Sequence, residues 1–153
     1  MLVTGDKAPE VVGVTDVGEY LSLGDLKGKI VVLYFYPKDD TPGCTKEAQG
    51  FRDSIQAFNA AGAQVIGVSR DSVTRHEKFK AKYDIPYTLI SDEDGKLCEA
   101  YGVWKLKKNY GREYMGIVRS TFLIDKNRNI AAAWTNVRVK GHVEKVLEGL
   151  QSL

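Results

Sequence analysis

One cysteine stands at the point where the sequence predicts the start of a helix. In the stretch "YPKDDTPGCTKEAQGF" (36–51), Thr41 can cap this helix and Pro42 suits its first position. Cys44 then falls in the first turn, where unpaired N–H groups and the positive end of the helix dipole favour an anion. A thiolate is such an anion, and cysteines at helix N-termini can have pKa values well below ~8.5. The pattern therefore predicts a nucleophilic cysteine.

The alternative for Cys44 is a small buried hydrophobic residue, because free cysteines are often buried. The flanking residues favour the reactive interpretation. Besides the cap and the proline, Gly43 lets the backbone come close to a bound molecule.

The predicted neighbouring elements would hold this cysteine at one edge of a sheet. The unbroken apolar run "IVVLYFY" (30–36) is typical of a strand buried on both faces. After it, apolar residues recur at helical spacing from Cys44 to Gly62 and predict one helix. Ligand sites in open α/β sheets favour the edge where a strand leads into a helix.

The remaining pattern alternates strands and helices and predicts one domain over 1–153. We expect an α/β, thioredoxin-like fold with a central mixed sheet and helices on both faces. The predicted strands cover 11–14, "EYLSL", 64–69, 87–92, 120–125 and 130–136; the predicted helices cover "SLGDLKGK", 72–84, "EDGKLCEAYGV" and the amphipathic "GHVEKVLEGLQSL".

Composition excludes several classes of protein. The chain has 153 residues, of which 22 are basic and 20 acidic, so its net charge of +2 favours neither nucleic acid nor anionic lipid as a partner. The N-terminus "MLVTGDKAPEVVG" lacks the pattern of a signal peptide, and no apolar run is long enough for a membrane span. With two cysteines, a disulfide framework is not expected, and we predict a cytoplasmic protein.

Other chemical motifs are weak or missing in the sequence. It contains no C-x-x-C, no zinc-ligand spacing and no nucleotide-binding glycine motif, so we predict neither a metal nor a cofactor. The stretch "WKLKKNYGREY" (104–114) mixes basic and aromatic residues, as nucleic-acid-binding segments do. We interpret it as a solvated loop, with the docking of a redox partner as the alternative.

The segment before the cysteine resembles the peroxidatic signature of the peroxiredoxins. Pro37, Thr41 and Cys44 have the spacing Pro-x-x-x-Thr-x-x-Cys, and "FYPKDDTPGCTKEA" is similar to the bacterioferritin comigratory protein (PrxQ) branch. The strings "GDKAPE", "VIGVSRDS", "YGVW", "VRSTFLID" and "VKGHVEKVL" extend the resemblance over nearly the whole chain. It implies a thiol peroxidase that reduces hydrogen peroxide and organic hydroperoxides.

The resemblance also implies roles for the residues around the thiol. Cys44 would attack the peroxide and become a sulfenic acid. The Thr41 hydroxyl and the backbone N–H groups of Gly43 and Cys44 would donate hydrogen bonds to the reacting oxygens. Pro37 would shield the sulfur from bulk water.

Two charged residues extend this predicted site. Arg119, in "VRSTFLID", matches the family's arginine that reaches the sulfur; without the motif it would be interpreted as a surface strand residue. Glu47 matches a glutamate of the branch and could orient Arg119. The alternative for Glu47 is an exposed carboxylate in the first helical turn.

The chain departs from the branch at the residue that resolves the sulfenic acid. Many members carry a second cysteine five residues after the first, where this chain has Gln49; others carry it on the helix predicted over 72–84, which has no cysteine here. Cys98 is the one remaining thiol, and we interpret it as a small core residue rather than a resolving one. We therefore expect an external thiol or thioredoxin to reduce the enzyme, and we expect a monomer. The rival hypothesis is a non-catalytic thioredoxin-fold module that senses redox state or binds a partner.

Overall fold

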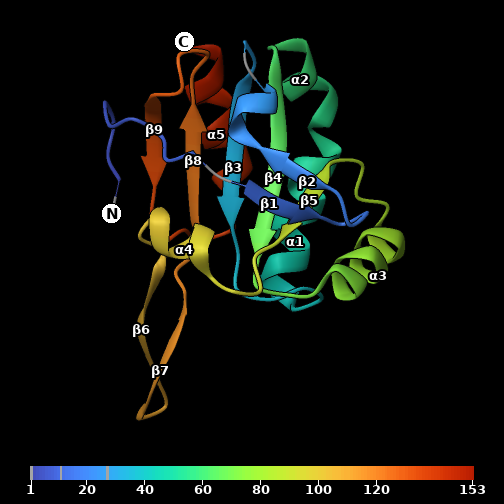
Figure 1. The fold of residues 1–153 in the computed structure, drawn as a ribbon, viewed down its shortest axis with the longest axis vertical. Coiled ribbons are helices and arrows are strands. Elements are labelled where there is room, and N and C mark those ends of the chain that lie inside the picture. Colours follow the sequence, from blue (N-terminus) through green and yellow to red (C-terminus); the bar gives the residue numbers. More distant parts are fainter. Residues whose placement is uncertain (1, 11, 27) are drawn as a thin grey trace.

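The computed structural model describes residues 2–10, 12–26 and 28–153, and a seven-stranded sheet lies at its centre (Figure 1). The spatial order of the strands is β2-β1-β5-β4-β3-β8-β9. β3 pairs in parallel with β4, and β4 with β5, whereas β3 and β8 are antiparallel, so the sheet is mixed. The strands are β1 (Val12–Thr15), β2 (Tyr20–Ser22), β3 (Ile30–Phe35), β4 (Ala63–Ser69), β5 (Thr88–Ser91), β8 (Ser120–Ile124) and β9 (Ile130–Trp134).

Helices cover both faces of this sheet, which confirms the predicted thioredoxin-like α/β fold. All six residues of β3 are buried because the strand is central and covered on both sides. The helices are η1 (Leu23–Leu26, a 3-10 turn), α1 (Pro42–Asp53), α2 (Ile55–Ala60), α3 (Val73–Tyr83), α4 (Lys96–Ala100) and α5 (His142–Gln151). No helix in these residues is long and apolar enough to cross a membrane.

The side chains of β3 alternate between two hydrophobic cores, one on each face. Tyr34 packs with residues of α1, α2, α3 and α5, among them Cys44. Phe35 faces the other way and packs with η1 and α4, among whose residues is Cys98. The two thiols of the chain therefore lie on opposite faces of the sheet.

The single helix predicted from Cys44 to Gly62 is divided in the structure. α1 ends and α2 begins around Ser54, whose φ of −104° and ψ of 8° leave the helical region. Serine is a weak helix former because its hydroxyl competes for backbone hydrogen bonds. Phe51 and Phe58, on either side of the break, lie in one core, with ring centroids 5.6 Å apart.

The loop predicted over 104–114 is wrong, because this segment is a β-hairpin that extends away from the sheet (Figure 1). β6 (Trp104–Asn109) and β7 (Arg112–Ile117) pair antiparallel around Tyr110 and Gly111. Both turn residues have positive φ, 51° and 75°, as in the two-residue turns that suit the twist of a hairpin. Most of its side chains are exposed, so its sequence lacks the alternation that predicts a half-buried strand.

Candidate active site

The sheet places Arg119 beside the thiol of Cys44, although the two residues are 75 positions apart in the sequence. Cys44 lies in the first turn of α1, just beyond the end of β3, and is 2% exposed. Because Phe35 pairs with Ser120 in the antiparallel β3–β8 ladder, Arg119 lies beside the exit of β3. Its Nη2 atom is 3.3 Å from the Sγ atom of Cys44. The predicted pairing of these two residues is thus present in the geometry.

A buried glutamate holds the other side of the same guanidinium. The Nη1 atom of Arg119 donates to Oε1 of Glu47 at 2.7 Å. Glu47 lies one helical turn after Cys44, on the same inward face, and is fully buried. The alternative of an exposed first-turn carboxylate is therefore wrong, and the contact fits the orienting role.

Burial raises the pKa of Glu47 to about 7, although the neighbouring Arg119 charge acts in the opposite direction. The ion pair only partly offsets the loss of water around the carboxylate. Within the described residues the Oε2 atom has no hydrogen-bond partner. The carboxyl group therefore titrates near neutral pH.

Sequence reasoning missed two residues behind this glutamate. His142, at the start of α5, places its Nε2 atom 3.9 Å from Oε2 of Glu47 and 2.7 Å from the Thr121 hydroxyl. Burial and then the charge of Arg119 lower the pKa of His142 to about 4, so its ring is neutral at pH 7. Thr121 follows Arg119 by two residues in an extended segment, and this period of two was the signal that both share one face.

The hydroxyl of Thr41 has a different partner from the one expected. Thr41 is the N-cap by position, with φ −96° and ψ 155°, but its side chain makes no capping bond. Its hydroxyl instead donates to the carbonyl of Lys38 at 2.8 Å. A hydroxyl has one proton, so Thr41 in this arrangement can accept a hydrogen bond from a bound molecule but not donate one. The expected donor role is wrong for this conformation.

Gly43 adjoins the guanidinium that contacts the thiol, whereas Pro37 lies in a groove beside the hairpin. A Cβ atom on Gly43 would lie 3.2 Å from Nη2 of Arg119, so the glycine permits the close approach of the guanidinium. Pro37 lines a groove that continues to Trp104, Lys107 and Met115 of the hairpin.

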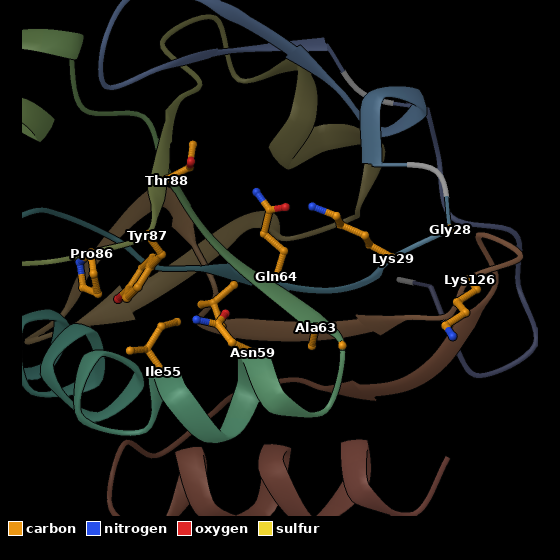
Figure 2. A pocket seen from close by; sticks show the side chains of 12 residues that line it. Gly28, Lys29, Ile55, Asn59, Ala63, Gln64, Pro86, Tyr87, Thr88 and Lys126 are labelled. Carbon is orange, nitrogen blue, oxygen red and sulfur yellow. The ribbon is translucent and has the colours of Figure 1, made fainter.

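A second pocket lies away from this group (Figure 2). It is lined by residues at the start of β4, such as Ala63 and Gln64, together with Asn59, Tyr87 and Lys126. None of the predicted site residues contributes to it.

Cys98 is separated from the site by the central sheet. It is fully buried in the core on the other face of the sheet, and burial raises the pKa of its thiol well above the usual range. A disulfide needs Cβ atoms about 3.5–4.5 Å apart. Because the two thiols lie on opposite faces of the sheet, a bond between them would require a large rearrangement of the chain.

Comparison with known proteins agrees with this geometry. Residues 4–133 match the model of the AhpC/TSA family. A putative peroxiredoxin bcp of Coxiella burnetii is 57% identical over 94% of this chain and 95% of its own length, and peroxiredoxin Bcp of Bacillus subtilis is 54% identical over 97% and 95%. The chain belongs to the AhpC/TSA family. Within it, the relatives place the chain in the bacterioferritin comigratory protein (PrxQ) branch of the peroxiredoxins, so it is a thiol peroxidase.

A solved structure supports both the fold and the branch. The bacterioferritin comigratory protein of Xanthomonas campestris, studied for its alkyl peroxide reduction, has a TM-score of 0.89 and 42% identity to this chain. The match covers 93% of this chain and 90% of that one.

Proposed function

We propose that this peroxiredoxin reduces hydrogen peroxide and organic hydroperoxides with Cys44 as its nucleophile. The observation that carries the proposal is the buried contact between Cys44 Sγ and the Arg119 guanidinium, which Glu47 holds from the other side. The guanidinium stabilises the thiolate and stays charged at any working pH. The reported alkyl peroxide reduction by the Xanthomonas campestris relative supports organic hydroperoxides as substrates.

In the proposed reaction the Cys44 thiolate attacks one peroxide oxygen. An S–O bond forms and the O–O bond breaks, so that the sulfur is oxidised to a sulfenic acid and the peroxide is reduced. The electron pair of the O–O bond moves to the second oxygen, which takes a proton and leaves as water or alcohol. The negative charge on that oxygen grows in the transition state, where fixed donors lower the barrier most.

The residues around the sulfur suit these demands. Arg119 and the N–H groups of Gly43 and Cys44, which a helix leaves unpaired in its first turn, supply the donors. The Thr41 hydroxyl accepts a hydrogen bond from the O–H of the peroxide, because it already donates its own hydrogen to the backbone carbonyl of Lys38. Pro37 limits the access of water to the sulfur.

We propose that an external thiol closes the cycle. Its thiolate attacks the sulfenic sulfur, forms a mixed disulfide and releases water; a second thiol then reduces this disulfide. The burial of Cys98 on the opposite face and the absence of a thiol at Gln49 support this route. A thioredoxin, which carries two thiols, or two molecules of a small thiol meet the requirement.

The rival function is redox sensing without turnover, and one experiment separates the two. Peroxide consumption with dithiothreitol is measured for the wild type and for Cys44→Ser. We expect turnover for the wild type alone, and equal rates for both proteins would refute the assignment. Mass spectrometry after one equivalent of peroxide without reductant should find a sulfenic acid on Cys44, whereas a Cys44–Cys98 disulfide would contradict the external-thiol route.

Three further expectations stay predictions from the sequence. They are a single domain over 1–153, a cytoplasmic location and a monomeric state. Size-exclusion chromatography with light scattering would test the monomer.

A further inference from the structure

Two buried polar side chains, one in the loop from β3 to α1 and one on α3, have no part in the mechanism above. Asp39 is 2% exposed and His76, on α3, is fully buried. The Nδ1 atom of His76 lies 2.6 Å from Oδ2 of Asp39. Asp39 follows Pro37 by two residues and precedes Thr41 by two, so it lies between two residues of the peroxide site.

Both ring nitrogens of His76 face hydrogen-bond acceptors. Nδ1 meets the carboxylate of Asp39, and Nε2 lies 2.9 Å from the carbonyl oxygen of Ile90. A carbonyl oxygen can only accept, so Nε2 carries a hydrogen. The ring therefore donates to Ile90 through Nε2 and shares a proton with the carboxyl of Asp39 through Nδ1, so both nitrogens are engaged.

The other groups around this pair are also engaged. The Tyr36 hydroxyl donates to Oδ1 of Asp39 at 2.6 Å, and the backbone N–H of Asp39 donates to Oδ2 of Asp71 at 2.9 Å. Asp71 in turn accepts from the Arg75 guanidinium at 3.0 Å. Asp39, Asp71 and His76 have the side-chain types of a metal site, but their facing atoms are occupied by these hydrogen bonds.

These bonds attach the catalytic loop to three elements of the body. Through Asp39 the loop is bound to α3 by His76, to the end of β4 by Asp71 and, through the ring of His76, to β5 at Ile90. A misplacement of about 1 Å at a reacting site can lower a rate about 100-fold. Loss of the bond from His76 to Asp39 would remove one of these attachments at a point midway between Pro37 and Thr41.

We propose that His76 is a positioning residue: its buried ring holds Asp39, and through it Pro37 and Thr41, in the arrangement that peroxide reduction needs. The inference rests on the proposed role of Cys44, and it assigns to His76 no contact with the peroxide. Its effect should therefore fall on the reaction with peroxide and not on the intrinsic reactivity of the thiolate.

Two amide substitutions separate the two hydrogen bonds of the ring. The amide nitrogen of asparagine can replace Nδ1, so His76→Asn keeps a donor for Asp39 and loses the bond to Ile90. The amide nitrogen of glutamine can replace Nε2, so His76→Gln keeps the bond to Ile90 and loses the donor for Asp39. The two variants are matched controls, because each removes the ring and keeps one of its two bonds.

The rate constant of each protein is measured with hydrogen peroxide and, separately, for alkylation of Cys44 by iodoacetamide. We expect His76→Gln to react with peroxide at least about 10-fold more slowly than His76→Asn, with alkylation rates within about twofold. Equal peroxide rates for the two variants, or parallel losses in both reactions, would overturn the inference. Urea unfolding of both variants checks that each is folded at the assay temperature.

Nitrogen NMR of the wild type tests the bond to Ile90 directly. We expect Nε2 of His76 to carry a hydrogen, and an unprotonated Nε2 would contradict the inferred arrangement. If the wild type itself consumed no peroxide, the proposed function would fail. An active wild type with indistinguishable variants would instead refute the role of His76 alone.

Discussion

Replacing Glu47 with glutamine should change how the stability of the protein depends on pH. The carboxyl group is fully buried, and in the folded protein its pKa is about 7 against an ordinary value of 4.5. Between these two values the folded state binds more protons than the unfolded state, so the free energy of unfolding falls as pH rises. Glu47 is thus a group whose ionisation opposes folding.

The size of the effect follows from the two pKa values. One pKa unit corresponds to about 1.4 kcal/mol, so a difference of about 2.5 units between 4.5 and about 7 sets a limit of about 3 kcal/mol. At pH 5 the Glu47 carboxyl of the unfolded chain has begun to ionise, and its burial lowers the free energy of unfolding by about 1 kcal/mol. At pH 8 this loss of stability is close to the limit. Between pH 5 and pH 8 the free energy of unfolding of the wild type should therefore fall by about 2 kcal/mol relative to that of Glu47→Gln.

Urea unfolding at pH 5 and pH 8 measures this difference. Both proteins should carry Cys44→Ser, so that oxidation of the thiol does not disturb the measurement. His142 titrates in the opposite sense: its lowered pKa makes stability fall as pH falls from 6.5 toward about 4, and it is present in both proteins. We expect the glutamine variant to gain stability relative to its parent from pH 5 to pH 8. A parallel pH dependence of the two proteins would refute the interpretation of Glu47 as a buried carboxylate with a raised pKa.

Three further substitutions test the site. Arg119→Lys should slow the reaction with peroxide about 10- to 100-fold, because an ammonium cannot bridge Glu47 and Cys44 as the planar guanidinium does; stopped-flow kinetics that match the wild type would contradict this. Gly43→Ala should lower the same rate several-fold, because its Cβ would lie 3.2 Å from Nη2 of Arg119, and an unchanged rate would show that the guanidinium can shift freely. Cys98→Ala should leave turnover with dithiothreitol within about twofold of the wild type, since its thiol lies on the other face of the sheet; loss of turnover would reinstate it as a resolving residue.

Local patterns were enough to predict the segment that carries the nucleophile. The apolar run that became β3, and the threonine, proline and glycine before Cys44, act over a few residues, so their strand and helix preferences could be interpreted without knowledge of the rest of the chain. The helix break at Ser54 and the hairpin at 104–117 were missed. At both places the local preferences are weak, and packing or turn geometry determined the structure.

The contacts that complete the site were decided by tertiary structure. Arg119 reaches Cys44 only because β3 and β8 pair in one register, and residue numbers 75 apart carry no such information without the family resemblance. The burial of Glu47 and the pairing of His76 with Asp39 likewise depend on where α5 and α3 pack. The sequence by itself determined where a reactive thiol could stand; the fold decided which charges surround it, because electrostatic contacts depend on distance and burial in space rather than along the chain.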